Sequence, residues 1–597
     1  MKLPFLEKFR QDARGNIAMI FALALPVLVV GTGLSVDMMR LEVENVRLQK
    51  ALDASALAAA KEYGKTQDKA TLEKWAKAYF FTNAGRRAGM DTVFTYNGVT
   101  VVNGNAVMKV SATRKVPMIF GQIIMALAPG GSDKTNAMLN KFSEIIVQNR
   151  SIEMALVLDN SGSMKNAAAG GGGTKISSLK SATATLVDQM MAVSTSNVQY
   201  PVSMSVVPFS GAVNVGSSHA SDPWMDTKGL SPAHHDDFDW SSWNILGVPQ
   251  ALPKLGGGWG HILSGEYLTR FYLYKNMKVN GVLRYPEGWA GCPQSRPLGL
   301  AVTDDEPTAS RPETLFVPMF APSEHNWGGS LASLKNDWIP DTNNATGNTD
   351  QATLTRQRDM NKYFSATKTN ADADGPNQAC STNPITPLTK TKSVVSKAVA
   401  DMEPLGGTNI AEGLAWGWRT LSSRAPFTEG KPAQVEDNMK ILVLMTDGEN
   451  TYNPAYSNGD QVDYPSGGKS MFGTHGYAQI LEKNALRPGR MFDATKTTVK
   501  KADIDNVTSA LNEMTSIVCE NIKSDGRNPD GSDGIVIFSI AFDLKDGSPV
   551  KERLRACASS GINGNGAKLY YDAKSSSDLA AAFQSITEEI SSLRIAR

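Results

Sequence analysis

The chain has 597 residues, of which 41% are hydrophobic and 20% are charged. These fractions are typical of globular proteins and argue against a disordered, collagen-like or coiled-coil chain. Lysine and arginine number 60 against 59 for aspartate and glutamate, so no overall positive field favours binding to nucleic acid. Four cysteines are too few for a disulfide-dense scaffold but suffice for two bridges in an oxidising compartment.

The first predicted element is an apolar helix near the N-terminus. Ile17 to Val36 contains no charged residue, and as a helix it spans about 30 Å, the hydrocarbon thickness of a bilayer. Four basic residues precede it: Lys2, Lys8, Arg10 and Arg14. Positive charge on that side predicts a cytoplasmic N-terminus with the bulk of the chain outside. A cleaved signal peptide is the alternative, but this run is longer than the apolar core of such peptides.

A small α+β module is expected at about residues 40–146. Apolar residues from Met38 to Glu62 recur at helical spacing: Met38, Leu41, Leu48, Leu52, Ala56 and Ala59. Residues 92–113 alternate as strands do, and Asn103-Gly104 is a strong signal for a hairpin turn. The apolar run Met118–Leu127 is too short to cross a membrane and contains Gln122.

From Glu153 onward the pattern becomes that of an α/β domain. Strands are expected at Met154–Leu158, Val202–Val207, Ile441–Met445, Ile535–Phe542 and Lys568–Tyr571. Helices are expected at Ile176–Ala192, Lys390–Met402, Ile410–Leu421, Ile504–Ile522 and Leu579–Leu593. Nearly continuous apolar strands that alternate with helices predict a parallel, doubly wound sheet.

The stretch of about 217–385 interrupts this alternation and is predicted to be an inserted subdomain. It holds seven of the ten tryptophans together with many prolines and glycines. Those tryptophans could form a carbohydrate-binding surface, but in an insertion with little regular structure we expect them to fill a small core.

Oxygen-bearing side chains follow several predicted strands and helices of this sheet. Asp159, Ser161 and Ser163 come directly after the first strand. Thr408 precedes a helix, and Asp447 follows the strand Ile441–Met445. Ligands bind at the carboxyl edge of open α/β sheets, and carboxylate and hydroxyl oxygens suit Mg²⁺ better than zinc. An Asp or Ser that merely caps the next helix is the alternative for the first group.

These residues resemble the metal-ion-dependent adhesion site of von Willebrand factor A domains. The matching motifs are Asp159-x-Ser161-x-Ser163, Thr408 and Thr446-Asp447-Gly448, in that order. The resemblance covers about residues 150–216 and 386–597. It implies that Asp159, Ser161, Ser163, Thr408 and Asp447 surround one divalent cation, Mg²⁺ or else Mn²⁺ or Ca²⁺, and that a partner's carboxylate fills the open position.

A second resemblance, to TadG-like Flp pilus assembly proteins, spans most of the chain. It rests on Phe9-x-x-Asp12-x-Arg14-Gly15-Asn16, on Leu48 to Ala60, and on motifs around Trp289, Gly375, Gly413 and Cys557. It implies a component of the tight-adherence (Tad) machinery at the envelope of Gram-negative bacteria. The expected partners are proteins of that Tad/Flp pilus apparatus, engaged through an acidic side chain, together with the inner membrane.

Together these patterns predict four regions. They are a cytoplasmic tail (1–14), a transmembrane helix (15–36), a helical stalk with a small β module (37–148), and an A domain (149–597) interrupted at about 217–385. Most of the chain is expected in the periplasm. The cysteines are predicted to pair as Cys292–Cys380, both in the insertion, and as Cys519–Cys557, which flank the strand Ile535–Phe542.

No nucleophile–base pair stands in a recognisable motif, so we expect a binding protein rather than an enzyme. The expected function is metal-dependent protein binding in pilus assembly and adherence. The alternatives are a surface adhesin for an external ligand and a minor pilin-like structural component with a passenger A domain. His234-His235-Asp236-Asp237 could bind a metal, but a solvated turn is the preferred interpretation.

Overall fold

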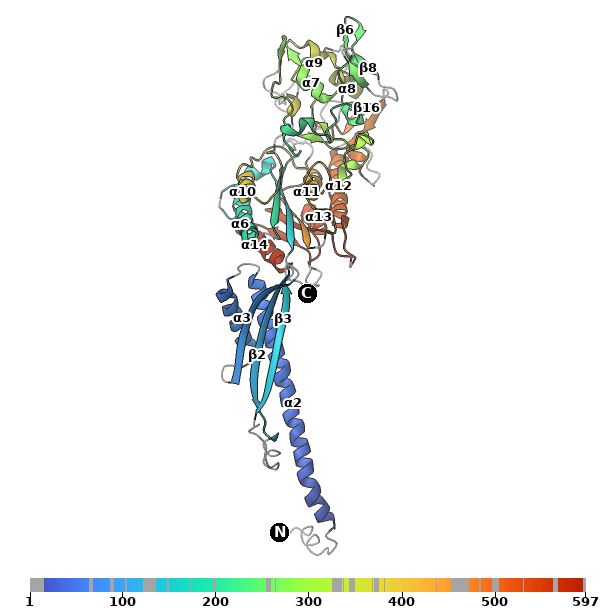
Figure 1. Ribbon diagram of the computed structural model, residues 1–597. Coiled ribbons are helices and arrows are strands. Elements are labelled where there is room, and N and C mark those ends of the chain that lie inside the picture. Colours follow the sequence, from blue (N-terminus) through green and yellow to red (C-terminus); the bar gives the residue numbers. More distant parts are fainter. Residues whose placement is uncertain are drawn as a thin grey trace. The chain divides into compact units, whose positions relative to one another are not determined.

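The structure is a computed structural model (Figure 1). The described residues are 16–63, 68–85, 91–102, 105–121, 136–147, 150–171, 173–196, 200–253, 259–262, 265–324, 336, 338–342, 349–367, 369, 375–378, 380, 382–435, 437–451, 472–482, 485–495, 504–529, 531–561 and 567–593. The chain forms two compact units, residues 1–149 with 589–597 and residues 150–588.

The first unit begins with the long helix α2 (Asn16–Tyr63), which contains Pro26. Its early apolar side chains are exposed, with Leu23 and Val27 each 71% accessible, and the helix is long and apolar enough to cross a membrane. Two hydroxyls in this part bond back to the helix, Thr32 Oγ1 to Leu28 O (2.8 Å) and Ser35 Oγ to Gly31 O (2.9 Å). Such bonds satisfy polar groups that lipid could not.

The rest of this unit is a three-stranded antiparallel sheet with two helices packed on one face. The elements are α3 (Lys69–Asn83), β1 (Thr92–Val102), β2 (Asn105–Pro117) and β3 (Asn136–Val147), and the strand order is β1-β2-β3. Leu48, Leu52, Ala56 and Ala59 of α2 are fully buried in this core, as the helical spacing predicts. Met38 is 64% exposed, so its place in the predicted packing face is wrong. The predicted turn at Asn103-Gly104 lies outside the described residues.

The second unit is built on a six-stranded sheet in the order β14-β5-β4-β15-β18-β19. Its strands are β4 (Ser151–Asp159), β5 (Val202–Phe209), β14 (Thr386–Thr389), β15 (Asn438–Thr446), β18 (Ile535–Phe542) and β19 (Tyr570–Ala573). β4 is buried along its whole length and β15 everywhere except at Asn438, which explains their continuous apolar sequences. All neighbours are parallel except β14, which pairs antiparallel with β5. The expectation of a wholly parallel sheet is therefore wrong at this edge.

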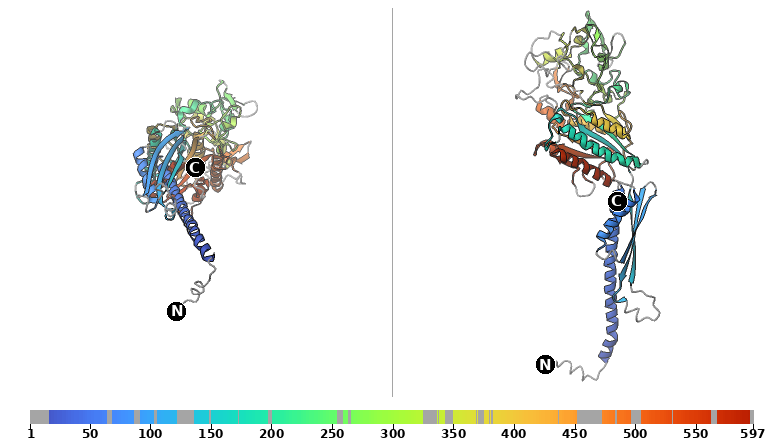
Figure 2. Two further views of the ribbon diagram at one scale, coloured as in Figure 1. Left: turned by 60° about the horizontal axis from the view of Figure 1, so that its bottom comes forward. Right: turned by 90° about the vertical axis from the view of Figure 1, so that its left-hand side faces the viewer.

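Helices cover both faces of the sheet, as in a doubly wound fold (Figures 1 and 2). On one side lie α6 (Lys175–Ser196), α10 (Lys392–Ala400) and α14 (Ser576–Leu593), which face the viewer in the right panel of Figure 2. On the other lie α11 (Ile410–Leu421), α12 (Ile504–Ser524) and α13 (Pro549–Cys557). This three-layer arrangement with one antiparallel edge strand is the predicted von Willebrand factor A fold.

Helix α11 has glycine at two positions where strand side chains pack directly against its backbone. A Cβ on Gly413 would lie 2.6 Å from Cγ of Phe209, and one on Gly417 would lie 2.3 Å from Cγ2 of Val157. All twelve residues of α11 are buried. The glycines therefore let the helix approach β4 and β5 closely, next to the strand ends that carry the candidate site.

Where the structure describes the insertion, its helices and strands are all short, as its irregular sequence suggests. They are α7 (Arg270–Asn276), α8 (Asp350–Arg358), α9 (Asn361–Ser365), β6 (Asn244–Ile245), β7 (Val248–Pro249), β8 (Ala251–Pro253), β9 (Trp259–Ile262), β10 (Lys278–Val279), β11 (Val282–Leu283), β12 (Pro293–Gln294) and β13 (Val317–Pro318). A segment from far along the chain, with β16 (Gln479–Glu482) and β17 (Ala485–Pro488), packs against them.

Five tryptophans of the insertion are buried, which confirms that they fill a core: Trp224, Trp240, Trp243, Trp289 and Trp338. This core is continuous with that of the A domain, because the rings of Phe316 and Trp416 lie 4.9 Å apart. Both predicted disulfides are present, Cys292–Cys380 in the insertion and Cys519–Cys557 between α12 and α13.

Candidate metal site

The candidate site lies where β4 and β15 end side by side. Met445 pairs with Leu158 in parallel register, so Thr446 and Asp159 leave the sheet at the same edge. The Thr446 hydroxyl donates to Asp159 Oδ2 at 2.6 Å, and the Ser161 backbone N–H donates to Asp159 Oδ1 at 2.8 Å. Both oxygens of this fully buried carboxylate are therefore held in place.

The two serines link Asp159's loop to the second carboxylate. Ser161 Oγ lies 3.0 Å from Ser163 Oγ, and Ser163 Oγ donates to Asp447 Oδ1 at 2.6 Å. Ser161 and Asp447 are 1% and 5% exposed. Residues at positions 159, 161, 163 and 447 thus form one connected set of buried and partly buried polar groups.

Thr408 reaches the same place on a loop that is bonded to the first one. Leu405 N donates to Asn160 O, and Gly162 N donates to Gly406 O, both at 2.9 Å. A Cβ on Gly448 would lie 3.7 Å from Thr408 Oγ1 and 3.9 Å from Ser163 Oγ, which places both hydroxyls beside Gly448. The structure therefore brings together all five side chains that the sequence selected.

The site concentrates negative charge in a buried position. Burial, and after it the charge of Asp447, raises the pKa of Asp159 to about 7. A divalent cation between the two carboxylates would relieve both costs. Two carboxylates with three hydroxyls are also the hard-oxygen donors that Mg²⁺ prefers. On donor chemistry and charge, the residues present fit the cation that the motif implies.

Two further charged residues border the site and were not selected from the sequence. Lys175, the first residue of α6, places Nζ 3.0 Å from Asp447 Oδ2 and 3.2 Å from Asp543 Oδ2. Burial opposes the Lys175 charge, but the two aspartates outweigh it and raise the pKa of Lys175. Asp543 follows β18 at the same sheet edge, a strand-end position that could have been recognised. Nothing in the sequence around Lys175 signals its contact with Asp447.

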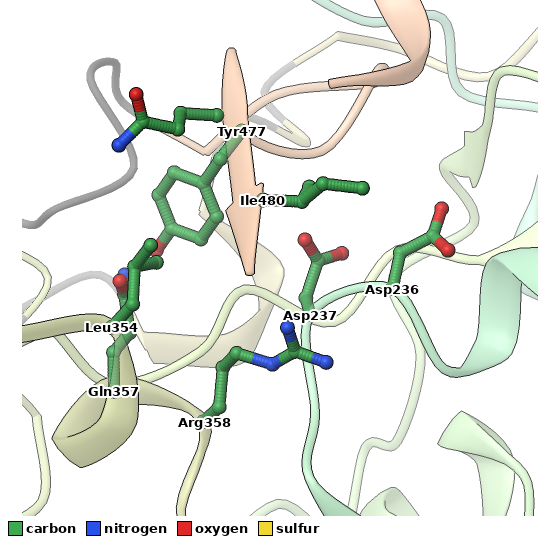
Figure 3. Close-up of a pocket in the computed structure, with 8 residues that line it drawn as sticks. Asp236, Asp237, Leu354, Gln357, Arg358, Tyr477 and Ile480 are labelled. Atoms are coloured by element: carbon green, nitrogen blue, oxygen red, sulfur yellow. The ribbon is translucent and has the colours of Figure 1, made fainter. Parts of the chain in front are cut away.

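The cluster His234 to Asp237 is not the solvated turn that the sequence suggested. His234 is fully buried, and Asp237 is 3% exposed. Asp237 Oδ2 pairs with Arg270 at 2.9 Å, and Asp236 Oδ2 pairs with Arg490 at 2.9 Å. Figure 3 shows both carboxylates above the guanidinium of Arg358, with Tyr477 and Ile480 of the later segment nearby. The Asp236–Arg490 ion pair links the insertion to the segment that contains β16 and β17.

No group of three or more His, Cys, Asp or Glu side chains suited to a metal occurs within the described ranges. The site at Asp159 differs from such groups because three of its five side chains carry hydroxyls rather than carboxylates. Strand order, helix layers and this strand-end site together define the second unit as a von Willebrand factor A-type domain.

The N-terminal segment is similar to a more narrowly defined protein family. Residues 15–62 match the family model described as "Putative Flp pilus-assembly TadE/G-like". This match confirms the TadG-like resemblance for the apolar helix and its continuation. No curated protein matches the chain in sequence.

Some solved structures resemble the chain weakly. The vWF domain of the type V pili tip protein Mfa5 from Porphyromonas gingivalis is 11% identical, with a TM-score of 0.30 over 75% of this chain and 97% of that one. The PilB minor pilin from Streptococcus sanguinis is 12% identical, with a TM-score of 0.28 over 84% and 78%. A von Willebrand factor type A structure from Catenulispora acidiphila is 9% identical, with a TM-score of 0.24 over 83% and 49%. Scores this low carry no argument, so the fold assignment rests on the strand order itself.

Proposed function

We propose that the chain is a membrane-anchored, metal-dependent protein-binding component of Flp/Tad pilus assembly and adherence. The TadE/G-like match over residues 15–62 supports the pilus-related role. The observation that carries the binding role is the convergence of Asp159, Asp447 and three hydroxyls at one buried strand edge. The A domain binds a partner and does not catalyse a reaction.

In this proposal Asp159, Ser161, Ser163, Thr408 and Asp447 hold one Mg²⁺, some of them through water. Mg²⁺ is preferred to Ca²⁺ because it keeps water ligands that a partner can displace. When both are ionised, the two carboxylates match the two charges of Mg²⁺, and hydroxyls and water supply its other oxygens. An acidic side chain of a pilus-apparatus protein then supplies a displacing oxygen and completes the binding site.

The anchor of the proposed protein is α2, inserted in the inner membrane with the N-terminus in the cytoplasm. Its exposed apolar residues and the bonded hydroxyls of Thr32 and Ser35 support insertion in lipid. The basic residues before the span support the orientation. The two disulfides support a periplasmic location for the A domain.

The test is thermal unfolding of the full-length protein in detergent, with and without MgCl₂, MnCl₂ or CaCl₂. We expect divalent ions to raise Tm in the wild type and to leave Asp159→Ala unchanged, because that variant loses a charged ligand. Ser161→Ala should lose less of the shift. Asp188→Ala is the matched control, since Asp188 is a largely exposed carboxylate on α6.

Pull-down from native membranes, with and without a chelator, tests the partner. Capture of pilus-apparatus proteins that the chelator and Asp159→Ala both abolish supports the proposal. If no divalent ion shifts Tm and Asp159→Ala still supports piliation, the A domain is a passenger and the minor-pilin alternative holds. Normal piliation after deletion of the gene, with the protein accessible at the cell surface, would favour the external adhesin.

A further inference from the structure

The segment that follows β2 is hydrogen-bonded to helix α2. Three backbone N–H groups donate to the carboxylate of Asp37, from Ile119 at 3.0 Å, Phe120 at 2.8 Å and Gly121 at 2.9 Å. Asp37 is 2% exposed and is the first charged residue after the apolar span Ile17–Val36. The segment that continues β2 is therefore fixed to α2 where the span ends.

Phe120 extends this attachment into the span itself. A Cβ on Gly33 would lie 2.5 Å from both Cγ and Cδ1 of the Phe120 ring, so the ring packs directly on the helix backbone. Gly33 lies three residues before Val36, which is roughly 4.5 Å of helix at 1.5 Å per residue. Any bilayer that covers α2 as far as Val36 must also reach the Phe120 ring.

The side chains around this attachment are apolar and poorly covered. Ile119 is 54% exposed, and Met38 and Met39 of α2 are 64% and 72% exposed. Apolar groups left in water at this level would be unfavourable, whereas the acyl-chain boundary of a bilayer would cover them.

We propose that this segment after β2 is a second membrane contact, in which Ile119 and Phe120 enter the outer leaflet of the phospholipid bilayer beside α2. The occupant of the surface is lipid, because the surface is continuous with a helix that lipid already surrounds. The exposed Lys115 and the partly exposed Arg40 lie within a few residues of it and are placed to meet phosphate headgroups. This inference rests on the proposed anchoring of α2.

The test uses the full-length protein in vesicles of phosphatidylethanolamine and phosphatidylglycerol that contain lipids with a spin label either near the headgroup, to report position 119, or deep in the acyl chain, to report position 25. All four native cysteines are in disulfides, so one added cysteine carries the only free thiol for an environment-sensitive dye. Ile119→Cys reports the proposed contact, and Leu25→Cys reports the span. Phe142→Cys is the matched control, 69% exposed and paired with Ser111, eight residues along β2 from Ile119.

We expect lipid quenching and a blue-shifted emission at position 119, and neither effect at position 142. Quenching at position 25 with none at 119 overturns the membrane contact but leaves the anchor intact. Absence of quenching at position 25 overturns the anchor, and the contact with it.

A second pair of variants separates this contact from a general effect on the span. Gly33→Leu must displace the Phe120 ring, whereas a Cβ on Gly31 meets nothing within 4 Å. We expect Gly33→Leu to abolish quenching of the dye at position 119 and Gly31→Leu to preserve it, with quenching at position 25 equal in both. Equal quenching at position 119 in the two variants would contradict the role of the Phe120–Gly33 contact.

Discussion

Lys175 and Asp447 form a buried ion pair, with Nζ of the lysine 3.0 Å from Oδ2 of the aspartate. The same nitrogen lies 3.2 Å from Asp543 Oδ2, and the lysine side chain is only 10% exposed. A fixed positive charge therefore stands beside one of the two carboxylates that are proposed to hold a cation. It stabilises the site when no metal is bound and opposes the metal when one arrives.

Lys175→Met should therefore tighten Mg²⁺ binding. A doubly charged cation and an ammonium about 5 Å apart repel by roughly 7 kcal/mol at an effective dielectric constant of about 20, and only a part of this reaches the binding constant because water and neighbouring groups rearrange when the metal binds. We expect Kd for Mg²⁺ to fall about tenfold, which corresponds to about 1.4 kcal/mol. The metal-free variant should at the same time have a lower Tm, since Asp447 loses its partner. Calorimetric titration with MgCl₂ and a thermal scan in chelator measure the two effects.

Lys165→Met is the control for this experiment. Lys165 lies two residues after Ser163, in the loop that carries Ser161 and Ser163. It is exposed, so water and salt screen its charge. Its Kd for Mg²⁺ should match that of the wild type. An unchanged Kd in Lys175→Met would show that this lysine does not compete with the cation.

His475 should make the protein less stable in acid. It is 2% exposed, and burial, together with the charge of Arg490, lowers its pKa from 6.5 to about 3. The unfolded chain therefore binds a proton below pH 6.5 that the folded chain refuses until about pH 3. Stability is lost as the pH falls through this window, by about 1.4 kcal/mol per pH unit.

His475→Asn removes this titration. The variant's free energy of unfolding minus that of the wild type should increase by about 2 kcal/mol when the pH is lowered from 7 to 5. Urea denaturation followed by tryptophan fluorescence at the two pH values measures the difference. If the difference between variant and wild type is the same at both, His475 is not the group responsible.

Gly417→Ala should destabilise the A domain although alanine favours a helix by about 1 kcal/mol. The added methyl would lie 2.3 Å from Val157 Cγ2 and 3.1 Å from Leu442 Cδ1. Overpacking of this kind costs about 1–3 kcal/mol, so we expect a net loss of stability in urea denaturation. Val157→Ala makes room for the methyl. The double variant should therefore be more stable than the sum of the two single effects, and strict additivity would argue against the clash.

The two disulfides should contribute slightly different amounts to the free energy of unfolding. Cys292–Cys380 joins residues 88 apart in sequence, and Cys519–Cys557 joins residues 38 apart. Loop entropy gives about 4.6 and about 3.8 kcal/mol for loops of these lengths. Replacing each pair by serines should lower the free energy of unfolding by amounts in that order. The unreduced, denatured wild type should show no reactive thiol, and four reactive thiols would disprove both bridges.

The sheet could be predicted because its central strands are buried on both faces and carry unbroken apolar sequences. Ile410–Leu421 and Ile535–Phe542 even have the predicted bounds. β14 was missed because Thr-Pro-Leu-Thr is a short edge strand, without the apolar run that burial demands of a central one. β19 begins two residues later than predicted, at Tyr570.

The five residues of the candidate site could be selected because each stands at a strand or helix end, a position that can be recognised from the order of elements along the chain. Lys175 and the buried charges of Asp236 and Asp237 depend instead on pairing with residues far away in sequence. Arg490, the partner of Asp236, is 254 residues distant. Charged residues in a polar stretch are usually solvated, and only the tertiary fold supplies the partners that permit their burial.

Strand β4 runs directly from the start of the A domain to the candidate site. The strand begins at Ser151, just after the first unit in sequence, and ends at Asp159 in the candidate site. Its neighbours β5 and β15 are both parallel and pair with it from Ile152 to Asp159 and from Ser151 to Leu158. If the proposed function holds, a pull between a bound partner and the anchor acts along this strand. It loads the hydrogen bonds on both sides in shear, all together, rather than opening them one after another.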